Sequence, residues 1–328
     1  MKVLSLFDGI SCGMVALERA GIPVERYVAF EIDEFAIKVS EANYPMIEHR
    51  GDVFDADFTE FKDFDLLIGG SPCTFWSIAK NGRETTPEGM GGKLFMEYVR
   101  ALKESGCKWF LYENNNSIDD AIKDFISWKL GPLPIMINSS LVSAQCRKRC
   151  YWTNIPNVEQ PSDLGLLLES VIDEKANEFM HSYEVDDTIF NSAPVYEDDE
   201  PVFSENILQI FADIPKGASA IRLGEIGKGS QGQRIYSTRG KSVCLSANGG
   251  GQGAKTGLYR IDLPNGKYLV RKLSPLEAER LQTLPDNYTD GISDTQRYKC
   301  IGNGWTVNVI AHILKNLSTQ SVDEVDTW

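Results

Sequence analysis

The sequence has few of the residues that usually build metal sites or histidine-based catalytic triads. Its three histidines, His49, His181 and His312, lie far apart along the chain. The seven cysteines are odd in number and scattered, and no two of them form a C-x-x-C pair. Zinc sites need ligands at short spacing, and disulfide frameworks usually have an even number of cysteines. The composition therefore argues against a zinc site, a disulfide scaffold and a histidine-based triad.

Long apolar runs are also missing. The apolar N-terminal stretch is interrupted by Asp8, so it is too short for a signal peptide, and no run of about 18 apolar residues occurs elsewhere. We therefore expect a cytoplasmic protein with no membrane partner. With 328 residues, of which 42% are hydrophobic, the chain can form about two domains with full cores.

Positive charge is scarce overall, and the net charge is -14. Residues 159–205 hold fourteen acidic side chains against Lys175 alone, whereas residues 206–272 hold eleven Lys and Arg against three acids. Outside residues 159–205 the chain as a whole is nearly neutral. A basic segment is typical of proteins that bind the phosphate backbone of nucleic acids, although a solvated basic surface has the same composition.

The first 155 residues alternate short apolar runs with helical patterns, which predicts a doubly wound α/β sheet. We expect strands at 3–7, 27–30, 66–68 and 109–112, and helices at 14–20, 35–44 and 94–103. Residues 206–272 have glycine clusters and alternating runs such as 242–246, which predict a smaller β-rich domain.

Two helices are expected after the basic segment. Ser274, Pro275 and Glu277 have the spacing of an N-terminal capping box with proline at the first helical position. The last helix should present one apolar face, made of Val307, Ile310, Ala311 and Leu314.

A thiol stands where a strand is expected to end. Cys73 follows the apolar run 65–70, and ligands of open α/β sheets bind outside the carboxyl ends of the strands. Glu113 also follows an apolar run, and Arg147 and Arg149 alternate along a third extended stretch. A lone cysteine is more often a small buried residue than a nucleophile. Here we expect a thiol, a carboxylate and a guanidinium to converge, which favours a nucleophile.

The first strand leads into a loop without the G-x-G-x-x-G pattern that binds pyrophosphate. Glu31 ends the second strand twenty-three residues after Asp8, a spacing that suits a ribose clamp. A nucleoside cofactor without phosphates fits this pattern, and S-adenosylmethionine is such a cofactor. We expect Glu31 to accept both ribose hydroxyls, Ile32 to cover the adenine and Asp52 to accept its amino group.

Taken together, these motifs resemble the cytosine carbon-5 DNA methyltransferase family of the bacterial and phage type over essentially the whole chain. The matching stretches are Phe7-Asp8-Gly9-Ile10-Ser11-Cys12-Gly13, Ser71-Pro72-Cys73, Glu113-Asn114, Gln145-x-Arg147-x-Arg149 and Gly302-Asn303-Gly304-Trp305-Thr306-Val307. Asn115 departs from the usual Glu-Asn-Val, and Trp305 departs from the commoner Gly-Asn-Ser-Val.

The resemblance implies a Rossmann-like, S-adenosylmethionine-dependent methyltransferase with a mixed sheet and a β-rich target-recognition domain. Residues 1–158 and 273–328 would form the catalytic domain, 159–205 an acidic connecting segment and 206–272 the recognition domain. The enzyme would methylate carbon 5 of a cytosine flipped out of a specific duplex DNA sequence, through a covalent cysteine adduct, and it would act as a monomer. A loop at 80–93 would close over the flipped base.

The resemblance also implies roles for particular residues. The catalytic residues would be Cys73, Glu113, Arg147 and Arg149. Cys73 would be the nucleophile, Glu113 would act at ring nitrogen 3, and Arg147 would lie beside the thiol. The cofactor would be bound by Phe7, Asp8, Gly9, Gly13, Glu31, Ile32, Asp52, Val53, Pro72, Leu94, Asn303 and Trp305. The bases would be read by Gln231, Arg234, Arg239, Asn248, Gln252 and Lys255.

Two other functions are open at this point. A transfer RNA methyltransferase on the same scaffold is disfavoured by the glycine-rich basic segment and by the lack of a Cys-Phe-Thr tripeptide. A non-catalytic DNA-binding homologue is disfavoured because Cys73, Glu113 and the two cofactor acids are all present. The sequence is compatible with a role in restriction-modification, phage protection or regulation.

Overall fold

The computed structural model describes residues 1–77, 82–185, 189–190, 195–197, 200–202, 219–247 and 256–318, with only the main chain at 73, 195–197, 200–202 and 318. The predicted DNA-reading residues Asn248, Gln252 and Lys255, and the start of the predicted lid, lie outside these ranges. The chain forms two compact units. The first unit is Met1–Ile137, Lys148–Gln160 and Val307–Trp328, and the second is Asn138–Arg147 and Pro161–Thr306. Within the described ranges, no helix is long and apolar enough to cross a membrane.

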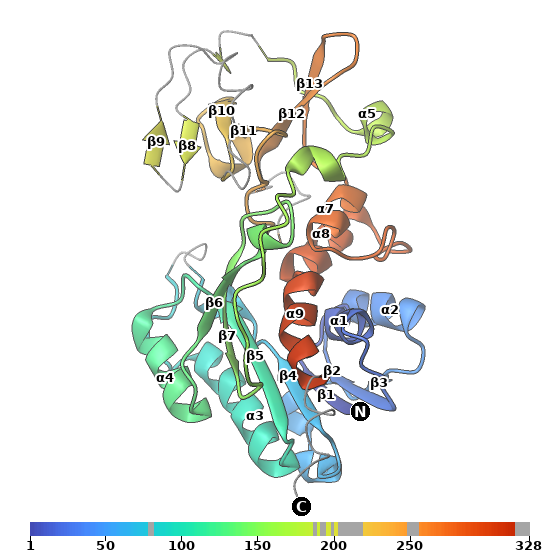
Figure 1. The fold of residues 1–328 in the computed structure, drawn as a ribbon, viewed down its shortest axis with the longest axis vertical. Coiled ribbons are helices and arrows are strands. Elements are labelled where there is room, and N and C mark those ends of the chain that lie inside the picture. The colour runs from blue at the N-terminus through green and yellow to red at the C-terminus, as the bar shows by residue number, and fades with distance from the viewer. Residues whose placement is uncertain are drawn as a thin grey trace, which may run out of the picture. The chain divides into compact units, whose positions relative to one another are not determined.

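A seven-stranded mixed sheet, in the order β3-β2-β1-β4-β5-β7-β6, forms the centre of the first unit (Figure 1). The strands are β1 (Lys2–Leu6), β2 (Arg26–Phe30), β3 (Glu48–His49), β4 (Leu66–Gly69), β5 (Trp109–Asn115), β6 (Ile135–Asn138) and β7 (Lys148–Thr153). Strands β1 to β5 pair in parallel, and β7 runs antiparallel to β5. The predicted α/β fold with a large mixed sheet is therefore confirmed.

Helices cover both faces of this sheet. They are α1 (Cys12–Arg19), α2 (Glu34–Asn43), α3 (Met90–Ser105), α4 (Asp120–Leu130) and α9 (Val307–Ser318). Side chains alternate across a strand, so Ile68 of β4 faces α1, whereas Tyr98 of α3 lies on the other face and donates to the Leu67 carbonyl at 3.2 Å. A Cβ atom at Gly13 would lie 2.4 Å from Ile68 Cδ1. Glycine there lets α1 approach the sheet.

The strand and helix positions predicted for the first unit are confirmed to within a few residues, with one correction. Strand β5 continues through Asn115, so Glu113 and Asn114 lie inside the strand and not after it. The reason is non-local, because β7 pairs with this polar end of β5, with Glu113 opposite Tyr151 and Asn115 opposite Arg149.

The second unit contains a four-stranded sheet in the order β10-β11-β12-β13. Its strands are β10 (Arg222–Glu225), β11 (Arg234–Ser237), β12 (Leu258–Asp262) and β13 (Tyr268–Arg271), and a small apolar cluster that includes Leu223, Ile235 and Val270 packs on it. The alternating run 242–246 forms no named strand. It makes a single bridge from Ser242 to Gln145, and the Leu245 amide donates to the Gln145 side chain. The limits of a target-recognition domain stay a prediction.

Shorter elements complete the second unit: β8 (Val195–Glu197), β9 (Glu200–Val202), α5 (Ala176–Phe179), α7 (Pro275–Leu281) and α8 (Asp294–Asn303). The predicted capping box is confirmed, because the Glu277 amide donates to Ser274 Oγ at 3.2 Å and the Ser274 amide donates to Glu277 Oε2 at 2.7 Å. Glu277 also forms a two-pronged pair with Arg271, and neither side chain is exposed.

Candidate active site

The loop after β1 has an unusual backbone. Phe7, Gly9 and Ser11 all have left-handed conformations, with φ of 56°, 61° and 58°. Such conformations are costly for residues other than glycine, so other contacts must hold them. They turn the chain tightly between the carboxyl end of β1 and the start of α1.

Asp8 provides these contacts. Its carboxylate accepts hydrogen bonds from the hydroxyls of Ser5 at 2.5 Å, Ser11 at 2.5 Å and Tyr27 at 2.7 Å. Burial raises the pKa of Asp8, and the three hydroxyl donors oppose that shift. In this structure Asp8, which was expected to bind the cofactor, supports the loop.

Glu31 follows β2 directly and is held by three main-chain amides. Gly9 donates to its Oε2, and Ile32 and Asp33 both donate to its Oε1, each at 2.8 Å. Burial raises the pKa of Glu31, and the amide donors partly offset the shift. An ionised carboxylate has about four lone-pair sites, so Oε2 keeps acceptor capacity toward a ligand.

Two large apolar side chains are exposed after the ends of strands β2 and β3. Ile32 is 72% exposed and Phe54 is 47% exposed. Asp52 caps the short helix Val53–Asp55 by accepting from the Phe54 amide at 3.0 Å. Apolar surface next to a fixed acceptor suits an adenosyl group, since ligand sites combine apolar walls with few polar groups. Phe54 was not predicted, and its only signal in the sequence is its closeness to Asp52.

The other predicted cofactor residues differ in exposure. Val53 is 4% exposed and packs in the core, and Leu94 packs against the same cluster. Pro72 is exposed. In the second unit Asn303 is exposed, whereas Trp305 is half-buried.

The segment that leads to Cys73 is tied to β5 by buried polar groups. Because β4 and β5 are parallel, with Gly69 opposite Tyr112, the residues that follow β4 lie beside the last residues of β5. Ser71 Oγ and the Tyr112 hydroxyl are 2.6 Å apart. The Asn114 amide donates to the Ser71 carbonyl at 3.3 Å and to the Tyr112 hydroxyl at 3.2 Å.

The structure pairs Glu113 with Arg149. Arg149 Nε lies 3.0 Å from Glu113 Oε1, and the two side chains are 11% and 12% exposed. Arg147 belongs to the second unit, where its guanidinium donates to the carbonyls of Leu245 at 3.0 Å, Gly302 at 3.1 Å and Gly304 at 2.9 Å. It supports the chain that leads to Trp305, and its predicted place beside the thiol stays a prediction.

The basic segment is less available to DNA than its composition indicated. Arg271 is fully buried against Glu277, and Lys241 is fully buried, with its Nζ donating to the Ser140 carbonyl at 2.7 Å. Burial lowers the pKa of Lys241. Arg222 pairs with Glu225, and Arg260 lies 3.0 Å from Asp262. Several of the eleven cations counted in the sequence therefore stabilise the fold.

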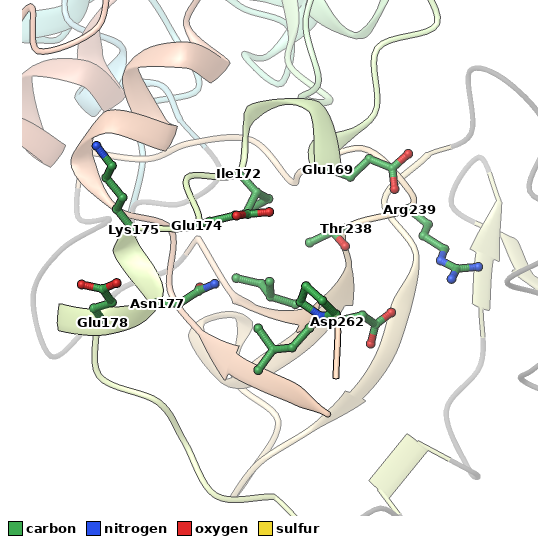
Figure 2. Close-up of a pocket in the computed structure, with 12 residues that line it drawn as sticks. Glu169, Ile172, Glu174, Lys175, Asn177, Glu178, Thr238, Arg239 and Asp262 are labelled. Carbon is green, nitrogen blue, oxygen red and sulfur yellow. The ribbon is translucent and has the colours of Figure 1, made fainter. Parts of the chain in front are cut away.

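Three of the predicted DNA-reading residues fall in the described ranges. Gln231 is exposed at the start of the short helix Gln231–Gln233, Arg234 begins β11, and Arg239 follows that strand. Arg239 lines a cavity of about 620 Å³ (Figure 2). The cavity is lined by Glu169, Ile172, Glu174, Lys175, Asn177, Glu178, Thr238, Arg239, Ile261, Asp262, Leu263 and Pro264. Its four carboxylates outnumber its two cations, which is the wrong sign for a phosphate.

Comparisons with known proteins agree with this fold. The chain is 31% identical over 339 residues to the type II methyltransferase M.HhaI of Haemophilus parahaemolyticus, covering 97% of this chain and 94% of that protein. It is 29% identical over 341 residues to the type II methyltransferase M1.ScrFI of Lactococcus lactis subsp. cremoris, covering 96% and 77%. The solved structure of the Entamoeba histolytica methyltransferase EhMeth has a similar fold, with a TM-score of 0.70 at 16% identity, covering 98% and 99%.

The fold and the similar sequences together place this chain among the methyltransferases. The sequence model described as "C-5 cytosine-specific DNA methylase" matches residues 1–319, and the chain belongs to this family. The protein is thus an enzyme that transfers a methyl group from S-adenosylmethionine to carbon 5 of cytosine in DNA. The predicted family, activity and cofactor are confirmed.

Proposed function

We propose that methylation proceeds through a covalent adduct between Cys73 and carbon 6 of a flipped-out cytosine. The observation that carries this proposal is the buried contact from Asn114 to Ser71. It brings the segment ending at Cys73 beside the strand that holds Glu113, which is paired with Arg149. A nucleophile and an oriented carboxyl group are the parts that this chemistry needs.

The residues divide the work as follows. The Cys73 thiolate donates its electron pair to carbon 6, and the charge that develops on the ring is absorbed at nitrogen 3 by a proton or a strong hydrogen bond from Glu113. Carbon 5 then becomes nucleophilic. Bound S-adenosylmethionine supplies the methyl group. Loss of the carbon-5 proton and elimination of the sulfur free Cys73.

The cofactor fits the edge formed by the strand ends of β2 and β3. Glu31 would accept a ribose hydroxyl at the site that the three amides leave open on Oε2, Ile32 and Phe54 would cover the adenine, and Asp52 would accept its amino group. Asp8 and Gly9 would act through the loop that they shape. The remaining predicted contacts, namely Phe7, Gly13, Val53, Pro72, Leu94, Asn303 and Trp305, keep their assignment as predictions.

We propose that the target is a specific sequence in duplex DNA, bound by one copy of the enzyme in the cytoplasm. Flipping a base costs a few kcal/mol. Hydrogen bonds to charged groups contribute about 1.5 to 3 kcal/mol each, so Glu113 and Arg149 can offset that cost. Gln231 and Arg234 lie in the basic segment and, apart from Arg239, which lines the acidic cavity, are the described candidates for reading bases. Because the relatives from Haemophilus parahaemolyticus and Lactococcus lactis are type II methyltransferases, we place the enzyme in restriction-modification.

The test begins with bisulfite sequencing of DNA from cells that express the protein, which identifies the methylated site. Duplex DNA with 5-fluorocytosine at that site, mixed with S-adenosylmethionine, should then trap a denaturation-resistant complex, because fluorine cannot leave as the proton does. Peptide mapping should place the link at Cys73. Cys73→Ala should abolish the adduct, and Glu113→Gln should slow it while cofactor affinity is unchanged.

A fluorinated RNA of the same sequence serves as the matched control. A link at another cysteine would refute the nucleophile. Trapping on RNA and not on DNA would contradict the substrate.

A further inference from the structure

Three buried polar side chains close a hydrogen-bonded ring just before the nucleophile. Ser71, Tyr112 and Asn114 are 3%, 0% and 1% exposed. The Tyr112 hydroxyl lies 2.6 Å from Ser71 Oγ and accepts a hydrogen bond from the Asn114 amide at 3.2 Å. The same amide group reaches the Ser71 carbonyl at 3.3 Å. Both the side chain and the main chain of Ser71 are therefore fixed to β5.

Packing alone does not account for the hydroxyl of Tyr112. Its ring contacts the aromatic rings of Phe95, Tyr98 and Trp152, with centroids 5.1, 4.9 and 5.9 Å away. A phenylalanine ring would make the same contacts. A buried hydroxyl must find hydrogen-bond partners, and an unsatisfied one is costly. The partners here are Ser71 and Asn114, so the hydroxyl of Tyr112 binds the segment that leads to Cys73.

Pro72 restricts the main chain between Ser71 and Cys73. It stands between Ser71 and Cys73, and its ring fixes φ near −65°, which leaves few ways for the chain to turn before the thiol. The main chain enters the short helix Cys73–Phe75 directly afterwards. Fixing Ser71 at two atoms therefore limits where the Cys73 main chain can lie.

We propose that Ser71 and Tyr112 are positioning residues, whose shared hydrogen bond sets the position of Cys73 for attack on carbon 6. This inference rests on the proposed covalent function. A displacement of about 1 Å at a reacting group can cost about 100-fold in rate. The pair should therefore affect the rate of adduct formation, whereas binding of the cofactor and of DNA should not depend on it.

The experiment measures the rate of adduct formation on saturating 5-fluorocytosine duplex with S-adenosylmethionine, followed by denaturing gels. Tyr112→Phe and Ser71→Ala should each slow the reaction by about 10-fold to 100-fold, with unchanged dissociation constants for cofactor and DNA. The double variant should be about as slow as the slower single variant, since residues that share one bond are not additive. Thermal unfolding shows whether each variant is folded. If Tyr112→Phe does not fold, the rate of Ser71→Ala alone tests the proposal.

Tyr98→Phe is the matched control. Tyr98 is also fully buried, and its hydroxyl donates to the Leu67 carbonyl. Leu67 lies within β4, whereas Ser71 follows that strand. The Tyr98→Phe variant should react at the wild-type rate. If the wild type traps at Cys73 and both Tyr112→Phe and Ser71→Ala keep its rate, the positioning role is wrong while the proposed function stands. If Tyr98→Phe is equally slow, loss of any buried hydroxyl hydrogen bond in this core slows the reaction, and the inference is also overturned. No adduct with the wild type would refute the proposed function itself.

Discussion

In the proposed cofactor site, Glu31 would combine two tasks in one carboxylate. Three main-chain amides fix its orientation, and Oε2, which accepts from one of them, keeps capacity for a further hydrogen bond. Burial makes its ionised form harder to keep, and the amides supply the compensation. The side chain is thus oriented before the cofactor arrives, which reduces the entropy lost on binding.

We expect Glu31→Ala to weaken S-adenosylmethionine binding by about 1.5 to 3 kcal/mol, the contribution of hydrogen bonds to a charged group. Isothermal titration calorimetry measures this change. Glu34→Ala, an exposed position at the start of α2, is the control and should bind as the wild type does. Equal affinity of Glu31→Ala and the wild type would contradict the ribose assignment.

The affinity should also depend on pH. Because burial raises the pKa of Glu31 above the ordinary 4.5, protonation sets in at a higher pH than for an exposed glutamate. The ionised group is acceptor-only and binds a ribose hydroxyl more strongly than the protonated group does, so affinity should fall as pH falls through this raised pKa. Calorimetry across mildly acidic pH should show the fall in the wild type and a flatter profile in Glu31→Gln. The same profile in both would show that another group titrates, and Asp8, whose pKa is also raised, is the nearest candidate.

The Glu113 and Arg149 pair is largely shielded from water, so it should contribute more to the free energy of unfolding than surface pairs do. Arg149→Met should lower the free energy of unfolding by about 1.5 to 3 kcal/mol. Lys123→Met breaks a pair in which Asp120 is 90% exposed, and it should cost less than about 1 kcal/mol. Urea denaturation compares the two. A smaller loss for Arg149→Met than for Lys123→Met would mean that the pair with Glu113 is not formed in solution.

Helix α7 begins at a junction where a local motif and a long-range ion pair share one residue. Glu277 completes the capping box with Ser274 and also neutralises the buried Arg271 of β13. A capping box alone is a local device, visible in the sequence. The Glu277 carboxylate is also the counter-charge of the buried Arg271, and this ion pair couples the helix to the four-stranded sheet.

We expect Ser274→Ala to lower the free energy of unfolding by about 0.5 to 2 kcal/mol, as loss of an N-cap does. Glu277→Gln should cost more, about 3 to 5 kcal/mol, because it leaves Arg271 buried without a counter-charge. Asp286→Asn, in an exposed pair with Arg280, is the control and should change little. The order of the three values by urea denaturation is the test, and a milder effect of Glu277→Gln than of Ser274→Ala would contradict it.

The charge of the molecule is divided unevenly, and burial changes what that division means. The basic segment includes Lys241 and Arg271, which are buried, and other cations that pair with nearby acids. Arg234 is half-buried at the start of β11, with its Nε 3.4 Å from the Gly229 carbonyl. Affinity for DNA should therefore depend on a few cations such as Arg234 and not on the net charge of the segment.

Arg234→Ala should weaken DNA binding and reduce the slope of log affinity against log salt by about 0.9, the value for one phosphate contact. Arg222→Ala is the control, since Arg222 is paired with Glu225 within the same sheet, and its slope should equal that of the wild type. Fluorescence anisotropy with labelled duplex at several salt concentrations gives both slopes. An unchanged slope for Arg234→Ala would remove this residue from the DNA-binding surface.

Much of the architecture could be predicted because its signals are local. The alternation of apolar runs and helical patterns located the first strands and helices, and the spacing of Ser274 and Glu277 located the start of α7. The apolar face of α9 was visible in the same way, since Val307, Ile310 and Leu314 recur at helical spacing and are all buried. Residues a few positions apart determine such patterns, so one sequence is sufficient to predict them.

What the sequence determined by itself was therefore the order of the elements and the types of residue at the strand ends. The tertiary structure decided that Arg149 meets Glu113, because that depends on the register of β7 against β5. It also decided that Arg271 and Lys241 are buried, and that the alternating run 242–246 forms only a bridge to Gln145. Pairing and burial depend on residues far apart in the chain, and local periodicity carries no information about which distant partner a strand or a charge will meet.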